Sequence, residues 1–195
     1  MRSGQIHRKT KETEIDFKLL IEGCGSSIIE GDCAFLNHML ELFARHSRMD
    51  LIVSYKGDSE VDFHHTVEDL GIALGQCFKE AIGEKRGIKR YGSALIPMDE
   101  ALIRVAIDIS GRAHLTYHGE LPTEKVGTLD TELIEEFFQA FVRNSDVTMH
   151  IHKLEGKNSH HIIEGMFKAF GRALREASSI DIELKDEIPS TKGVL

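Results

Sequence analysis

Hydrophobic and polar residues over the first 82 positions alternate between strand-like and helix-like spacing. Apolar residues occupy every second position from Ile15 to Ile21, which predicts a strand with one buried face. A second, short strand is expected at residues 27–29. An apolar stripe from Leu36 to Phe43 then predicts a helix. A strand over 49–55 and a helix with inward-facing residues up to Ala81 complete the segment, so its pattern reads ββαβα.

The same order of elements recurs over residues 100–178. Alternation predicts a strand over 101–109, and a second strand is expected at 114–117. An apolar stripe from Leu133 to Phe141 predicts a helix. A strand over 147–154 precedes a last helix, which directs Phe167, Phe170 and Leu174 inward. The second segment is therefore again ββαβα.

The two segments also match residue by residue. His64, His65 and Glu68 align with His160, His161 and Glu164, and further pairs align in the strands and helices on either side. Small changes of offset between the matches correspond to insertions in loops. Such self-similarity indicates an internal duplication. We therefore expect an α+β fold of two similar halves, each a sheet with two helices on one face, related by a pseudo-twofold axis.

The duplication divides the chain into four parts that form one compact unit. Residues 1–82 are the first repeat and residues 100–178 the second. Between them, residues 83–99 are predicted to be a basic linker, since they contain the cluster from Lys85 to Arg90. Residues 179–195 form a C-terminal tail, too short for an element of its own.

Composition narrows the class of protein. With 195 residues, 41% of them hydrophobic, the chain can bury a substantial core. A net charge of −8 argues against a nucleic-acid surface, which would show a basic stripe. Cys24, Cys33 and Cys77 are odd in number and form no CxxC pair, as expected in a reducing compartment. No apolar run reaches membrane-spanning length, so we expect a cytoplasmic protein without a membrane partner.

Eleven histidines stand out, and four of them form the two aligned pairs. On a helix, the glutamate of each HHxxE motif lies one turn beyond the pair, so a histidine and a carboxylate share a face and can bind one metal ion. Adjacent histidines point about 100° apart around the axis, which suggests that each motif contributes to two ions. Alternatively, one such pair could be a solvated helix start behind an N-cap, Asp62 or Asn158. Two aligned copies favour metal binding.

Several longer stretches carry a resemblance to a known family. They are NHMLELFARH from Asn37, GDSEVDFHHTVEDLGIALGQ from Gly57, KRGIKRYG from Lys85, GKNSHHIIEGMFKAFGRALR from Gly156 and the closing PSTKGVL. Together they resemble imidazoleglycerol-phosphate dehydratase, the manganese lyase of histidine biosynthesis, over residues 8–195. The resemblance implies the ribosomal protein S5 domain 2-like fold, and the length fits the form without a fused phosphatase domain.

The resemblance also implies a reaction and a metal site. The substrate would be D-erythro-imidazole glycerol phosphate and the product imidazole acetol phosphate. Two Mn²⁺ ions per active site would bind the imidazole ring, using ligands from both repeats: His38, His64, His65, Glu68, Glu136, His160, His161 and Glu164. Position 136 departs from the family pattern, which has His there, and Glu136 could instead lie outside the ligand set. Asn37 replaces a usual Asp, which removes a predicted acceptor for His38.

A phosphate site and a proton-transfer residue follow from the same resemblance. The phosphate-binding residues would be Arg90, Arg112, Lys168, Ser190 and Lys192. Guanidinium groups bind phosphate bidentately and lysine supplies a point charge, so this set suits a phosphomonoester. Glu12 matches the proton-transfer position and is our candidate for the catalytic base. Its duplicate, Glu100, lies beside Asp99, and both remain alternatives.

Two other classes of protein are alternatives to the enzyme. A degenerate or non-catalytic di-metal-binding protein of the same fold would explain the departures at Asn37 and Glu136. A nucleic-acid-binding relative is disfavoured by the acidic balance. A metal store has no need for a phosphate-binding set, so the retained cations favour the enzyme. The resemblance further implies a hollow homo-oligomeric cage of about two dozen subunits, with active sites at subunit interfaces.

Overall fold

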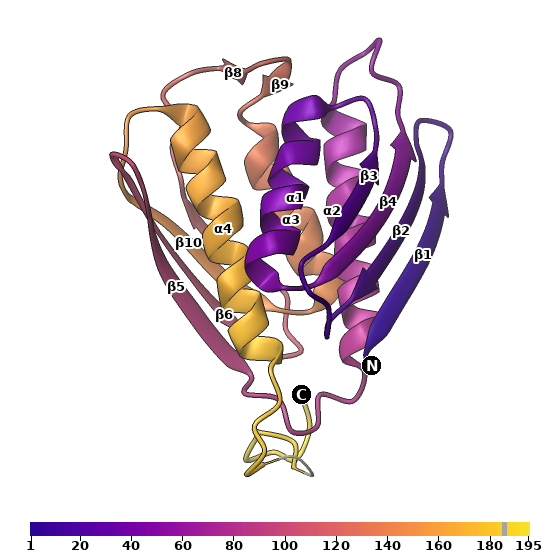
Figure 1. Cartoon of the computed structure of the whole chain (residues 1–195), viewed down its shortest axis with the longest axis vertical. Helices are drawn as coiled ribbons and strands as arrows, with labels where there is room; N and C mark the ends of the chain where they lie inside the picture. Colours follow the sequence, from indigo (N-terminus) through magenta and orange to yellow (C-terminus); the bar gives the residue numbers. More distant parts are fainter. Residues whose placement is uncertain (185–186) are drawn as a thin grey trace.

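The computed structural model describes residues 1–184 and 187–195 (Figure 1). The first half contains six elements: β1 (Ser3–Lys9), β2 (Glu14–Leu20), β3 (Ser27–Glu30), α1 (Ala34–Ser47), β4 (Asp50–Lys56) and α2 (His64–Ile82). The second half repeats this order with a small hairpin inserted: β5 (Tyr91–Met98), β6 (Ala101–Asp108), β7 (His114–His118), β8 (Lys125–Val126), β9 (Leu129–Asp130), α3 (Leu133–Ser145), β10 (Thr148–Glu155) and α4 (Ser159–Ser178).

Both halves contain a four-stranded sheet of the same topology. The strand orders are β1-β2-β4-β3 and β5-β6-β10-β7. In each sheet the last pair is parallel and the other pairs are antiparallel. The predicted α+β fold with duplicated halves is therefore confirmed.

Each half has one strand more than the ββαβα pattern predicted. The additional strands are β1 and β5, and β5 falls inside the stretch 83–99 that we expected to be a linker. Both are edge strands whose most buried position is a glycine, Gly4 or Gly92. A Cβ at either position would lie 2.1 Å from a helix carbonyl oxygen, that of Cys77 or Ala173. Because the helix backbone approaches so closely, no large apolar residue fits there, and the two-residue hydrophobic period is lost.

The four helices lie between the two sheets (Figure 1). Helix α2 packs on α3 and helix α1 packs on α4, so each helix of one half has a partner in the other. The core includes stacked rings of Phe43 and Phe170, whose centroids are 4.7 Å apart. All four helices begin at the same end of the molecule, and the C-terminal tail lies at the opposite end. The first turn of every helix can therefore contribute to one site.

No helix in the described ranges combines the length and the apolar character that a membrane crossing requires.

Candidate active site

The N-terminus of α4 holds one histidine pair in place. The side-chain Oδ1 of Asn158 accepts hydrogen bonds from the backbone N–H groups of His160, at 2.9 Å, and His161, at 3.3 Å. In the first half, Asp62 Oδ1 accepts the N–H of His64 at 2.7 Å. Each polar residue before a pair thus satisfies helix N–H groups that would otherwise lack partners. Both pairs lie in the first helical turn.

Three predicted ligands from the two halves converge at this end of the molecule. The ligand atoms of His38 on α1 and of His160 and Glu164 on α4 all lie within 4.8 Å of one another. His160 Nε2 is 3.4 Å from Glu164 Oε2. Within residues 1–184 and 187–195, this is the one group of three or more such side chains. Two imidazoles and a carboxylate suit Mn²⁺, Fe²⁺ or Zn²⁺.

Lys168 controls the charge of this group. Its Nζ lies 2.5 Å from Glu164 Oε1, one helical turn further along α4. Burial by itself would raise the pKa of Glu164, but the ion pair with Lys168 outweighs it and lowers the pKa. Glu164 is therefore ionised at neutral pH, as a metal ligand must be.

The second histidine of each pair points away from the first. The ring planes of His64 and His65 differ by 82°, and those of His160 and His161 by 81°. His65 Nδ1 lies 3.0 Å from Asp58 Oδ2, and His161 Nδ1 lies 2.7 Å from Glu100 Oε2. These hydrogen bonds raise the pKa of both histidines and orient each Nε2 away from its carboxylate partner. The two rings of a pair are therefore oriented differently, as expected if they bind different metal ions.

The duplicated carboxylates Glu12 and Glu100 have different surroundings. Glu100 also accepts hydrogen bonds from the N–H groups of Lys157, at 3.2 Å, and Asn158, at 2.8 Å. The bond with His161 and these backbone bonds lower the pKa of Glu100 to about 2. Glu12 is half exposed, and its Oε1 is 3.9 Å from His65 Nε2. Glu100 is therefore committed to orienting His161, whereas Glu12 is available for proton transfer.

The corresponding predicted ligands of the first half do not form an equally compact group. His64 and Glu68 lie on α2 and Glu136 lies on the adjacent helix α3, but in the described parts of the chain these three do not meet the spacing of the first group. Position 72, which aligns with Lys168, is Ile72, so the first half has no lysine at the position from which Lys168 pairs with Glu164.

The surroundings of Asn37 and His38 show what replaces the aspartate of the family pattern. The Asn37 amide donates to Gly31 O at 2.9 Å and accepts from the Tyr55 hydroxyl at 2.6 Å, so it ties α1 to the sheet. The carboxylate near His38 Nδ1 is Glu41, at 3.5 Å. Sequence reasoning missed both Glu41 and Asp58. An i,i+3 spacing could have indicated Glu41, whereas Asp58 has no counterpart in the second repeat.

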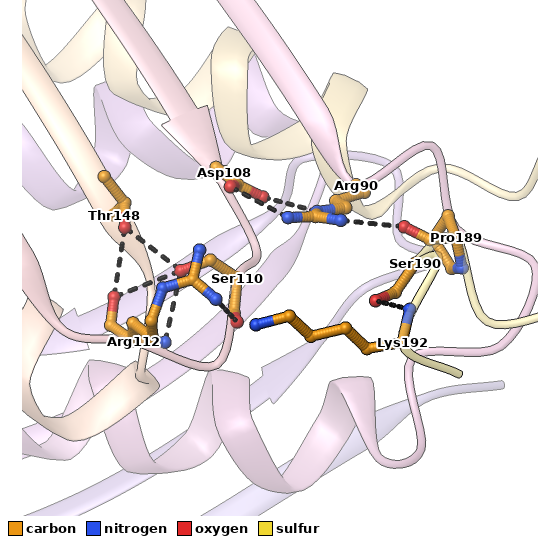
Figure 2. A network of polar contacts seen from close by, with 8 residues as sticks. All are labelled: Arg90, Asp108, Ser110, Arg112, Thr148, Pro189, Ser190 and Lys192. Carbon is orange, nitrogen blue, oxygen red and sulfur yellow. Dashed lines mark hydrogen bonds and ion pairs between the residues drawn. The ribbon is translucent and has the colours of Figure 1, made fainter. Parts of the chain in front are cut away.

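Four of the five predicted phosphate-binding residues gather at the opposite end (Figure 2). Arg90 Nε and Nη2 donate to Asp108 at 2.7 and 3.2 Å, and Nη1 donates to the carbonyl of Pro189 at 2.9 Å. A guanidinium has five N–H groups, so two remain for a ligand. The contact with Pro189 brings the C-terminal tail against the sheet.

Arg112 and the tail complete this cluster. The backbone N–H of Arg112 donates to Ser110 Oγ at 3.1 Å, and the Arg112 carbonyl accepts from Ser110 Oγ and from Thr148 Oγ1 at the same distance. Ser190 Oγ accepts the N–H of Lys192 at 3.2 Å. Figure 2 shows the Lys192 side chain extending toward the loop of Ser110 and Arg112. Two guanidinium groups, a lysine and a hydroxyl at the same end of the molecule suit an anion such as phosphate.

Lys168 is separated from this cluster. The backbone N–H of Arg90 bonds to Ala177 at the end of α4, whereas His160 lies in the first turn of that helix. Seventeen helical residues, roughly 25 Å, separate His160 from Ala177, and nine residues, roughly 14 Å, separate Lys168 from Ala177. One chain therefore places the metal ligands with Lys168 at one end, and Arg90, Arg112, Ser190 and Lys192 at the other.

Comparisons with known proteins agree on one family. Residues 31–174 match the family described as imidazoleglycerol-phosphate dehydratase. A protein of that name from a Synechococcus species is 52% identical over all of this chain and 96% of its own length. One from Oceanobacillus iheyensis is 55% identical over the whole of both chains.

A solved structure supports the same relation. The crystal structure of imidazoleglycerol-phosphate dehydratase from Staphylococcus aureus superposes with a TM-score of 0.84 at 44% identity. The match covers 92% of this chain and 99% of the other.

Proposed function

Because the chain belongs to the imidazoleglycerol-phosphate dehydratase family, the lyases that perform a dehydration in histidine biosynthesis, we propose that it converts D-erythro-imidazole glycerol phosphate to imidazole acetol phosphate. The observation that carries this proposal is the group formed by His38, His160 and Glu164 across the two halves. This group of imidazole and carboxylate donors supports a metal site that binds the imidazole ring of the substrate.

We propose that two Mn²⁺ ions serve each active site. The donor set fits a divalent ion, since His160 and His38 face an ionised carboxylate, and His65 and His161 are each oriented by a carboxylate. The ligands would be His38, His65, His160 and Glu164 together with His64, His161, Glu68 and Glu136. When bound, the metal supplies Lewis acidity that stabilises negative charge on the substrate ring. The choice of manganese rests on the family resemblance.

Glu12 is the proposed proton-transfer group. The reaction removes a hydroxyl from the carbon next to the ring and a proton from the following carbon, and the resulting enol tautomerises to the ketone of imidazole acetol phosphate. Glu12 is half exposed and its oxygen lies 3.9 Å from His65 Nε2, so its carboxylate borders the metal ligands without being engaged by backbone N–H groups. Glu100 is held by three hydrogen bonds and is a weaker base.

We further propose that each complete site is shared between subunits of a cage-like homo-oligomer of about two dozen chains. The metal ligands and the Arg90–Lys192 cluster lie at opposite ends of one chain, too far apart for one small substrate. A neighbouring copy can bring its phosphate cluster to the metal ligands of the first. Lys168, which lies beside Glu164, would then meet the phosphate from the metal side.

The residue environments also bear on location and on the alternative function. All three cysteines are free thiols, which supports a reducing cytoplasm.

A metal-binding protein without activity would retain the His38 group but would not need Arg90 to be oriented by Asp108. That ion pair favours the enzyme.

Mixing two inactive variants tests the shared site. Glu12→Gln disables the metal end and Arg112→Glu reverses a charge at the phosphate end. The two variants are dissociated by metal removal, combined in equal amounts and reassembled with Mn²⁺. Random assembly should restore about a quarter of wild-type turnover, because one site in four draws two intact halves. Mixtures as inactive as each variant alone would place the whole site within one chain.

A wild-type sample that binds metal but forms no imidazole acetol phosphate would contradict the proposed reaction itself. Wild-type protein taken through the same dissociation and reassembly serves as the control for recovery.

A further inference from the structure

Four histidines outside the proposed active site lie on one face of the second sheet. They are His114 and His118 on β7, and His150 and His152 on β10. Their neighbours Met149 and Ile151 are fully buried toward the helices, so the histidine rings point to the outer face. Figure 1 shows the helices on the inner side of this sheet. The proposed reaction uses none of these side chains.

His118 and His152 form the tightest pair. They are directly opposite each other in the parallel register of β7 and β10. Their ring centroids are 4.9 Å apart, with an interplanar angle of 45°. Metal–nitrogen bonds of about 2.0–2.1 Å at tetrahedral or square-planar angles place two ligating imidazole centroids about 4.5–5.2 Å apart. The observed separation lies within that range.

The other pairs of this face fit one ion less well. The centroids of His114 and His150 are 5.8 Å apart, and His114 Nε2 lies 3.1 Å from the hydroxyl of Thr116. His150 and His152 are 6.4 Å apart with parallel rings. In the described parts of the chain, the rings of His118 and His152 have no hydrogen bond or ion pair that would compete with a ligand.

We propose that His118 and His152 form a second metal site, which binds Zn²⁺, Ni²⁺ or Cu²⁺ with water completing the coordination. Ligands that are all imidazole favour these ions over Mn²⁺, which prefers carboxylate and water oxygen. The two sites would thus select different metals. The site at the helix N-termini combines histidine with carboxylates, and the one on the sheet has histidine alone.

The surroundings of His152 favour its neutral form, which is the form that binds a metal. Partial burial lowers the pKa of His152, and Arg104 on the neighbouring strand β6, His118 and His150 lower it further. Arg104 also opposes a bound cation. Its side chain is exposed, so solvent and salt screen that effect.

Metal counting on the intact, Mn²⁺-loaded enzyme tests the site. Wild-type protein is dialysed against Zn²⁺, and bound zinc is measured by elemental analysis. We expect one zinc per chain beyond that bound by His118→Gln. Losing one of two ligands should weaken zinc binding about 10²-fold, because the second bond of a chelate forms intramolecularly. His152→Gln should behave like His118→Gln.

Two matched variants serve as controls. His150→Gln removes a histidine from the same strand and face, and His7→Gln removes an exposed one from the other sheet. Both should keep the additional zinc, and Cu²⁺ bound to them should show two imidazole nitrogens in its electron paramagnetic resonance spectrum. Equal zinc in wild type and His118→Gln would overturn the proposal. An equal loss in His150→Gln would overturn the assignment to this pair.

Discussion

The two copies of the histidine motif share a sequence pattern, and in each copy a carboxylate orients the second histidine, but the charged residues around them differ. In the second half, Glu164 is paired with Lys168, His161 with Glu100, and Asn158 caps the helix. In the first half, the lysine position is Ile72, and Glu12 stays 3.9 Å from His65. The second copy therefore has its glutamate paired with a lysine, and the first leaves Glu12 without such a partner, which supports its proposed role in proton transfer.

Exchanging one carboxylate for its amide in each half separates these roles most clearly. Glu12→Gln should lower turnover by about 10²–10⁴-fold, because the base is lost while substrate and metal still bind. Steady-state rates together with calorimetry of substrate binding would show this. Near-normal turnover would remove Glu12 as the essential base and direct attention to Asp99 or Glu100.

The equivalent change in the second half should act on the metal instead. Glu100→Gln removes the carboxylate that orients His161, so metal affinity should fall about 10–100-fold. Turnover at saturating metal should recover to a large extent. Metal titration followed by activity measurement distinguishes the two variants, and a turnover loss in Glu100→Gln that excess metal cannot restore would reverse the assignment.

The pH dependence of metal binding should also differ between wild type and Glu100→Gln. His161 must be neutral to bind metal, and its hydrogen bond to Glu100 raises its pKa. Metal affinity is then highest above the raised pKa and falls by up to about tenfold per pH unit below it. The decline therefore begins at a pH above the ordinary histidine pKa of roughly 6.5. In Glu100→Gln the pKa returns toward its ordinary value, so the decline should start at lower pH. Metal titrations between pH 5 and 8 would test this.

Making the halves more alike should give the smallest effect. Glu136 aligns with His38 of the first repeat, and Glu136→His gives both repeats a histidine at this position. Glu136 and Glu68 lie on the packed helices α3 and α2, so removing one of these two negative charges should stabilise the metal-free protein, by about 1 kcal/mol or less. Denaturant unfolding of metal-free protein measures this, with Glu135→His on the exposed face of α3 as the control. Equal shifts in both variants would show that net charge alone is responsible.

Particular residues show how far sequence reasoning reached into the fold. The matching pairs His64–His160 and Glu68–Glu164 predicted two similar halves, and the two sheets of equal topology confirm them. The strands β1 and β5 were missed because Gly4 and Gly92 occupy the positions where an apolar residue would have shown the period. A strand cannot be recognised from its hydrophobic side chains when the buried position has room only for glycine.

Residue types and spacing by themselves predicted the duplication, the motif helices and the metal ligands of the two HHxxE motifs, whereas the phosphate-binding set followed from the family resemblance. These properties are local, since a helix turn or a strand alternation depends on near neighbours. Only the tertiary structure decided that His38 joins His160 and Glu164, that Asp108 holds Arg90, and that the two clusters lie at opposite ends. Those relations depend on packing between elements far apart along the chain, which spacing does not encode.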